Sequence, residues 1–252
     1  MLIVMAKAVA INVGANKNAE WGGFRSPIFA NGTLQFIHIP WKDHYGNITP
    51  APKKYFELPY GKYVPANLRN KQVFNSPNFE NKTYASTTNA PANKSLLSLN
   101  SDDYLFFYAT LDFADDISDK AKWINPDWGA YLVGVFKVRT KYDSLKSVLS
   151  SREGISDFEE YAWYKIMRAS GFDNDNAPWI KGENDGSGLL DTAIPLSDAA
   201  DSQKWSDIAV EVFRTTSQRE LNQEKKAVFQ TVLTCEGENL MKLLSLCKVR
   251  KV

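Results

Sequence analysis

The segments DDYLFFYATL at residues 102–111 and WGAYLVGVFKV at residues 128–138 predict the clearest pair of strands in the chain. Both are rich in aromatic and β-branched residues, which favour a pleated and buried surface. Asp102 and Asp103 mark a turn before the first strand. Gly134 inside the second indicates a bulge or a close approach of another backbone segment. We therefore expect two buried strands, joined by a charged segment that carries a short helix or loop.

Further strands are expected on the N-terminal side of this pair. The apolar residues 1–13 predict a first strand, which ends in a loop of Asn and Gly residues. Asn31 and Gly32 stand between two apolar runs and predict a hairpin, and residues 34–39 alternate with the period of a strand. The stretch 41–95 has little periodicity, so it is either a functional surface or a set of short strands.

The C-terminal part of the chain shows mainly helical patterns. A capping-box pattern at Ser156 and Glu159 predicts the start of a helix, and residues 172–200 are expected to form a loop rich in Asn, Asp and Gly. Residues 206–247 show helical spacing with a break near Gly237. A strand-rich first half followed by a helix-rich second half indicates the α+β class.

The length of the chain bounds its domain organisation. Its 252 residues, 44% of them apolar, are enough for one large or two small globular domains with a buried core. We expect one α+β unit over residues 1–200, with helices over residues 201–252 packed on the same unit.

Charge and residue counts exclude several classes of protein. Thirty basic against 29 acidic residues leave a net charge of +1, which excludes a strongly basic binder of duplex DNA but allows a local basic groove. Two cysteines, Cys235 and Cys247, exclude a disulfide scaffold and a four-cysteine zinc site. One unbroken helix would separate them by about 18 Å, so we expect both to be reduced. Two histidines, His38 and His44, are too few for a zinc site built on several histidines.

The apolar N-terminus lacks the features of a secreted or membrane-bound protein. It has no basic region of the kind that begins a signal peptide, and Lys7 interrupts its apolar run. The run is also too short to span a bilayer. We therefore expect a cytoplasmic protein without a membrane partner.

Two loop motifs lack residues that their ligands would need. Counted from Asp173, a calcium loop would require glycine at Pro178 and glutamate at Asn184. The glycine-rich residues 182–188 lack the Gly-Lys-Ser/Thr ending of a phosphate-binding loop. Lys181 and nearby backbone amides still indicate, weakly, a site that could bind phosphate. We expect no metal ion and no cofactor.

Aromatic residues are the most informative group. Many lie outside the periodic segments: Trp21, Trp41, Tyr45, Tyr55, Phe79, Tyr84, Trp123, Trp128 and Trp179. Loop aromatics near Arg25, Lys181 and several asparagines suit base stacking with hydrogen bonds to the base edge. His38 lies between two isoleucines of a predicted strand, where a lone histidine is expected to be structural.

Three groups of segments together resemble one protein family. They are residues 12–14 with 25–29 and 32–40, residues 79–84 with 94–99 and 103–111, and residues 181–183 with Ser187 and 191–197. This combination is similar to the third type of nucleotide-modification-associated domain and spans most of residues 9–197. The sequence departs from the family pattern at His38 and Trp41, where the pattern has a proline and an acidic residue.

The resemblance implies that the protein belongs to a DNA or nucleotide modification system, but it does not imply a particular reaction. The strand pair also resembles, more loosely, the central pair of PUA-like domains, which read modified bases. This second likeness implies a PUA-like barrel core in the first half, with a base pocket near the two strands.

A binding module for a nucleotide or a modified DNA base is our first hypothesis. Its expected binding residues are Asn12, Asn16, Arg25, Ser26, Tyr84, Tyr108, Trp128, Lys181 and Ser187. Arg25 and Lys181 would contact phosphate or a base edge, and the aromatic residues would form the walls of the base pocket. This hypothesis predicts saturable binding without turnover.

An enzyme that modifies a base or nucleotide, by a transferase or glycosidase-like reaction, is the second hypothesis. Glu80 is the best candidate for its acid/base, because a place between Phe79 and Tyr84 would partly bury the side chain and favour its protonated form. A third hypothesis is a structural protein whose C-terminal helices bind another chain. The sequence contains no complete catalytic set of residues, so we favour the binding module.

Overall fold

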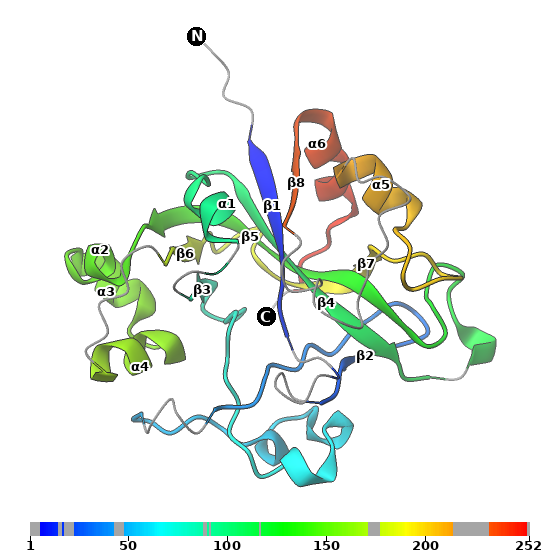
Figure 1. Cartoon of the computed structure of the whole chain (residues 1–252), viewed down its shortest axis with the longest axis horizontal. Coiled ribbons are helices and arrows are strands. Elements are labelled where there is room, and N and C mark those ends of the chain that lie inside the picture. The colour runs from blue at the N-terminus through cyan, green and yellow to red at the C-terminus, as the bar shows by residue number, and fades with distance from the viewer. Residues whose placement is uncertain are drawn as a thin grey trace.

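A computed structural model of the chain describes residues 6–14, 17, 23–42, 48–87, 90, 92–115, 117–170, 177–213 and 232–250. In these ranges eight strands form one mixed sheet (Figure 1). They are β1 (Lys7–Asn12), β2 (Ser26–Ile28), β3 (Thr83–Ala85), β4 (Tyr104–Phe113), β5 (Trp128–Tyr142), β6 (Trp179–Gly182), β7 (Gly188–Pro195) and β8 (Leu233–Glu236). Neighbouring strands follow the order β3-β6-β5-β4-β1-β8, with β2 paired to β4 and β7 paired to β5.

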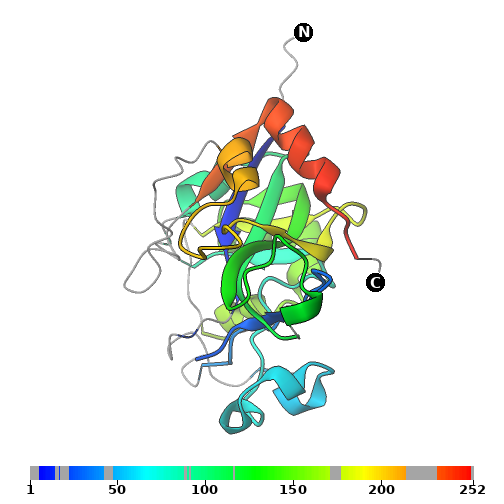
Figure 2. The ribbon, with the colours of Figure 1, turned by 90° about the vertical axis from the view of Figure 1, so that its right-hand side faces the viewer.

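The helices gather on different sides of this sheet. The α-helices are α1 (Asn93–Leu97), α2 (Leu145–Leu149), α3 (Arg152–Phe158), α4 (Ala162–Ser170), α5 (Asp207–Phe213) and α6 (Gly237–Leu246), and the 3₁₀ helices are η3 (Tyr55–Glu57), η4 (Gly61–Tyr63), η5 (Ala66–Leu68) and η6 (Ile117–Asp119). Helices α2–α4 lie on one side and α5 and α6 on another (Figure 1). The segment with η3–η5, coloured cyan, projects away from the sheet (Figure 2).

The predicted strand pair is confirmed and forms the centre of the sheet. β4 and β5 run antiparallel, with Tyr104 opposite Lys137. The pairing shifts by one residue beside Gly134, so the bulge that this glycine indicated is present. A Cβ atom at Gly134 would lie only 2.2 Å from Cε1 of Phe79, so another segment also approaches the strand closely there.

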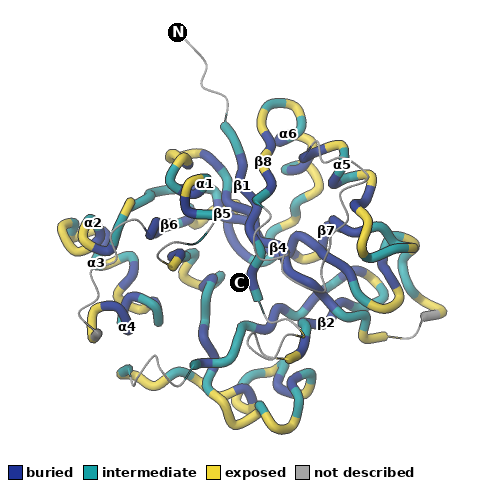
Figure 3. Tube along the Cα trace, viewed as in Figure 1, coloured by how far each residue is buried: buried dark blue, intermediate teal, exposed yellow. Residues whose placement is uncertain are grey.

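Alternation along β4 divides the core between the two faces of the sheet. Phe106 and Tyr108 belong to the cluster that packs against α5 and α6. Leu105 and Phe107 belong to the cluster on the other face, which includes residues 28–36 and α1. Because both faces are covered, β4 is an almost continuous apolar run. The two central strands are accordingly dark blue in the burial view (Figure 3).

A third cluster joins α2, α3 and α4 to the sheet through β6. Trp179 of β6 is fully buried. Its ring lies 5.3 Å from Phe158 and 6.2 Å from both Tyr161 and Tyr164, measured between ring centroids, and all three contacts are nearly perpendicular. Edge-to-face pairs of this kind are favourable beyond the area that they bury. One tryptophan therefore anchors the helical side of the molecule.

The α+β class is confirmed, but several details of the second half differ from expectation. Ser151 caps α3 by accepting a hydrogen bond from the Gly154 N–H, so the expected cap at Ser156 is wrong. The expected loop over residues 172–200 contains β6 and β7, and the expected helix over residues 206–247 contains β8. These strands are specified by pairing with β5 and β1, which local periodicity does not reveal.

The described strands do not close into a barrel. β3 and β8 stand at the two ends of the strand order and do not pair with each other. The PUA-like barrel that the looser resemblance implied is therefore not observed, since the sheet remains open.

The expected hairpin turn is present at Asn31 and Gly32. Gly32 has φ +83° and its N–H donates to the Phe29 carbonyl at 2.8 Å. The chain then returns through one bridge between Ile28 and Leu34, without a regular strand over residues 34–39.

Both cysteines are free thiols, as expected. Cys235 lies on β8 and Cys247 follows α6, which begins at Gly237, where the helical pattern was expected to break. Among the described helices, none is long and apolar enough to cross a bilayer.

Candidate functional site

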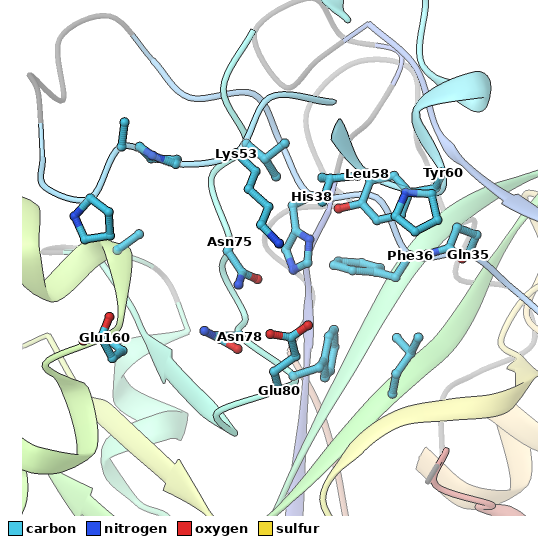
Figure 4. Close-up of a pocket in the computed structure, with 18 of the residues that line it drawn as sticks. Gln35, Phe36, His38, Lys53, Leu58, Tyr60, Asn75, Asn78, Glu80 and Glu160 are labelled. Carbon is cyan, nitrogen blue, oxygen red and sulfur yellow. The ribbon is translucent and has the colours of Figure 1, made fainter. Parts of the chain in front are cut away.

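A cavity of about 670 Å³ opens where distant segments of the chain meet (Figure 4). Residues 35–38 and 75–80 line one part of it, and residues 48–60 line the part opposite. Val73, Glu160, two residues of α4, Leu189 of β7 and Arg250 complete the lining. A cavity of this size is typical of sites for small organic ligands.

Aromatic rings form the floor of the cavity. Phe36 and Phe79 meet edge to face at 5.3 Å between centroids. Phe79 also contacts Phe107 and Phe136 of the central strands, at 5.5 and 5.8 Å. Gly134 leaves the space that the Phe79 ring occupies. The floor therefore rests directly on the strand bulge, and the packed core fixes its position.

A tight turn before β3 presents polar groups above this floor. The backbone N–H of Asn78 donates to the Thr83 carbonyl at 2.9 Å, and the Thr83 N–H donates back at 3.0 Å. The Asn81 N–H donates to Oδ1 of Asn78 at 2.9 Å. From β6, Nζ of Lys181 donates to the Asn81 carbonyl at 2.8 Å. The turn is thus fixed on both sides, and the exposed carboxylate of Glu80 points into the cavity (Figure 4).

His38 contributes a neutral imidazole ring to the lining. Its Nε2 donates to the Pro77 carbonyl at 2.8 Å, so Nδ1 carries a lone pair and acts as an acceptor. Nδ1 is buried and has no hydrogen-bond partner among the described residues. Burial lowers the pKa of His38 to about 4, against a smaller raising effect of the bond to Pro77. The ring is therefore uncharged at neutral pH.

Acidification is expected to destabilise the protein through His38. The unfolded chain protonates this residue near pH 6.5, whereas the folded protein resists protonation down to about pH 4. Above pH 6.5 His38 is neutral in both states and does not lower the free energy of unfolding. Between pH 6.5 and pH 4 protonation favours the unfolded chain, which lowers the free energy of unfolding by about 3 kcal/mol in total. Urea unfolding of wild type and His38→Gln at pH 7, 6, 5 and 4 measures this. The free energy of unfolding of wild type should fall more steeply with decreasing pH than that of His38→Gln. Parallel pH dependences of the two proteins would contradict the lowered pKa of His38.

Charged groups surround the aromatic floor. Lys53 extends into the cavity from the side opposite Glu80 (Figure 4). On the α4 side, Nζ of Lys165 lies 2.7 Å from Oε2 of Glu160. Burial, and then the negative charge of Glu80, raise the pKa of Tyr60 to about 12, so its hydroxyl stays protonated. The cavity thus combines an aromatic surface, acceptor groups and cations, which suits a planar polar ring with an anionic substituent.

Metal-ligating side chains do not assemble into groups of three or more within the described ranges.

Glu80 is the residue of the expected site that lines this cavity. Its exposure differs from the partial burial expected of it, because the turn projects its side chain beyond Phe79. The other described members of the expected site lie elsewhere, and their binding roles remain predictions. Asn16, like His44, lies outside the described residues.

Two of these residues, Tyr108 and Ser26, are buried in the protein interior, and Asn12 is half-buried beside Tyr108. Tyr108 is 1% exposed and hydrogen-bonds to the Asn12 side chain, while burial raises the pKa of its hydroxyl. The Ser26 hydroxyl accepts from the Ile37 N–H at 2.8 Å and is 3.3 Å from the Ile37 carbonyl. The Tyr108 and Ser26 hydroxyls are therefore occupied by contacts within the fold, whereas Nδ2 of Asn12 is buried without a hydrogen-bond partner among the described residues.

Arg25 and Trp128 form a separate pair. The guanidinium of Arg25 lies 4.3 Å from the centre of the Trp128 ring. Its Nη1 donates to Oδ1 of Asp112 at 3.1 Å. The cation is therefore both stacked and neutralised within the fold, which reduces its attraction for a phosphate.

The remaining expected residues support the sheet or the turn. Tyr84 packs against Phe107 at 5.5 Å between centroids. The Ser187 hydroxyl accepts from the Lys137 N–H at 2.9 Å. Lys181 lies behind the turn that carries Glu80, so its contact with the cavity is indirect.

The chain is thus an α+β protein with a cavity of about 670 Å³ beside its central strands. The sequence matches the family model of nucleotide modification associated domain 3 over residues 7–239. This match covers nearly the whole chain, so the chain belongs to that family and is associated with nucleotide modification. Searches among curated proteins and among solved structures found no match.

Several cavity residues were missed in the sequence. His38 was expected to be structural, which agrees with its bond to the Pro77 carbonyl, and Tyr60, Asn78 and Lys53 were not singled out. The signal that could have found them is the unusual length of the aperiodic stretch 41–95, which supplies much of the lining. This stretch holds three 3₁₀ helices and the short strand β3, and its role as a functional surface stays a prediction.

Proposed function

We propose that this cavity binds a nucleobase or nucleotide, and that the protein recognises this ligand within a nucleotide modification system. One observation carries the proposal: an aromatic floor lies next to acceptor groups in a cavity of about 670 Å³, in a member of this family. A base needs an aromatic surface for stacking and a few polar groups for its edge. The cavity offers both.

Stacking supplies the main attraction in this proposal. Phe79 and Tyr60 are half-buried, so both retain surface for a ligand, whereas Phe36 is 3% exposed and mainly supports the floor. Contact between a base and an aromatic side chain contributes about 1–3 kcal/mol. Such an energy is sufficient for specific binding when hydrogen bonds add to it.

Lys53 at the edge of the cavity would hold the phosphate. It extends toward the ligand space (Figure 4), whereas Lys165 on the α4 side is paired with Glu160. A single cation of this kind suits a mononucleotide or a single extruded base. The net charge of +1 does not favour long tracts of duplex DNA.

Binding should depend on Tyr60 and not on its neighbour Tyr63. We expect Tyr60→Ala to raise the dissociation constant for a mononucleotide about tenfold, because the stacking contact with the tyrosine ring is lost. Tyr63→Ala is the matched control, because Tyr63 lies in η4 nearby but packs against Phe29, with ring centroids 5.7 Å apart. It should change the constant less than twofold. Isothermal titration with mononucleotides measures both.

The outcomes of this titration separate the possibilities. A ligand at 100 times its dissociation constant stabilises the protein by about 2.7 kcal/mol, so a thermal-shift screen of nucleotides, nucleosides and short DNA selects the probe. Equal effects of the two tyrosine variants would contradict the cavity as the site. Failure of every nucleotide to bind would contradict the proposal itself.

Catalysis on the bound base is a second candidate function. It is favoured by the carboxylate of Glu80, which points into the cavity from the floor (Figure 4). In this case Glu80→Gln should retain ligand binding and abolish product, because the acid/base is lost. Chromatography of the nucleotide after incubation tests it, and recovery of unchanged ligand favours recognition.

A further inference from the structure

The residue that follows Phe79 of the aromatic floor carries a hydrogen-bond acceptor into the cavity. Glu80 follows Phe79 directly in the chain, and its two carboxylate oxygens face the cavity (Figure 4). The His38 ring lies 4.8 Å from the Phe36 ring and 6.5 Å from the Phe79 ring, between centroids. Because its Nε2 is engaged by Pro77, the nitrogen that remains can only accept. That nitrogen is buried, so the acceptor that the edge of a base on this floor would meet is the carboxylate of Glu80.

We infer that the cavity selects a base whose edge carries adjacent N–H donors, and that guanine fits best. This inference rests on the proposed function. Guanine presents a ring N–H and an exocyclic amino group side by side, which match the two oxygens of a carboxylate such as Glu80. Cytosine and adenine present one amino group beside an acceptor nitrogen. Thymine and uracil present one N–H between two carbonyl oxygens, which a carboxylate repels.

The carbonyl oxygen of the guanine edge also finds a partner. Asn78 lies beside Glu80, and Asn75 lies between Asn78 and Lys53 (Figure 4). Their side-chain amide groups include donors, which suit the carbonyl oxygen of the guanine edge. Lys53, on the opposite side, is left for the phosphate. The arrangement thus assigns groups of the protein to the N–H donors and the carbonyl oxygen of the guanine edge and to the phosphate.

Comparison of closely related nucleotides tests the inference directly. We would titrate the wild-type protein with dGMP, dIMP, dCMP, dAMP and TMP under one buffer condition. dIMP differs from dGMP only in lacking the exocyclic amino group, so it should bind about tenfold more weakly. TMP should bind at least tenfold more weakly than dGMP. Because these measurements use unmodified protein, they do not depend on any variant folding.

Variants of two carboxylate residues test which of them causes the preference for guanine. Glu80→Gln replaces one acceptor oxygen by a donor, and we expect it to reduce the ratio of dGMP to TMP affinity at least tenfold. Glu160→Gln is the matched control, since Glu160 also lines the cavity but is paired with Lys165. It should leave the ratio unchanged.

The outcomes are distinguishable. Equal affinity for dGMP, dIMP and TMP would overturn the guanine inference while leaving nucleotide binding intact. An unchanged ratio in Glu80→Gln, or a changed ratio in Glu160→Gln, would also overturn it. Absence of binding by all five nucleotides and the DNA probes would instead overturn the proposed function.

Discussion

Substitution of Trp179 by alanine is expected to lower the free energy of unfolding by about 4 kcal/mol. The side chain is fully buried and has perpendicular contacts with Phe158, Tyr161 and Tyr164. Removal of a large aromatic side chain from such a site costs about 3–5 kcal/mol, because the cavity that remains collapses only in part. Denaturant unfolding followed by circular dichroism measures the change.

A second tryptophan provides the control. Trp128 is half-buried and its main partner is the Arg25 guanidinium, so Trp128→Ala should cost less than half as much. It should also leave nucleotide affinity unchanged, whereas Trp179→Ala should weaken it by loosening α4 beside the cavity. Equal destabilisation by the two variants would contradict the role of Trp179 as an anchor.

Gly134→Ala is expected to disrupt the floor of the cavity. The new Cβ would lie 2.2 Å from Cε1 and 2.7 Å from Cζ of Phe79, and 3.1 Å from the carbonyl oxygen of Gly188. Phe79 must therefore move, which costs about 1–3 kcal/mol in a packed core and displaces the surface on which the base would stack. We expect at least tenfold weaker nucleotide binding, measured by titration, together with a lower melting temperature.

A double-mutant cycle isolates the cause of this effect. If the clash with Phe79 is responsible, Gly134→Ala should cost clearly less stability in a Phe79→Ala background than in wild type. Both residues are in contact, so strong non-additivity is expected. Additive free energies would show that the glycine matters for another reason, such as backbone conformation at the bulge.

The central strands could be predicted from the sequence because their apolar runs are long. β4 is buried on both faces, and β5 follows the same pattern until it leaves the core near Lys137. β6 and β8 have only four residues each, which is too short for a periodic signal. Their position is set by pairing with distant strands, so local sequence could not predict them.

The candidate site was predictable only in part, for a similar reason. Glu80 could be singled out because aromatic residues flank its segment. The other groups come from residues 35–38, 48–60 and α4, which meet only in the folded chain. The expected role of Arg25 could not be judged without knowing that Asp112, 87 positions away, is its partner.

Crystallisation of the protein with dGMP tests the central claim most directly, because it locates the ligand without any assumption about affinity. We predict that the base lies on Phe79, with its N–H edge toward Glu80 and its phosphate toward Lys53. Density for the nucleotide beside Arg25 and Trp128, or elsewhere away from Phe79, would contradict the assignment of this cavity as the nucleotide site.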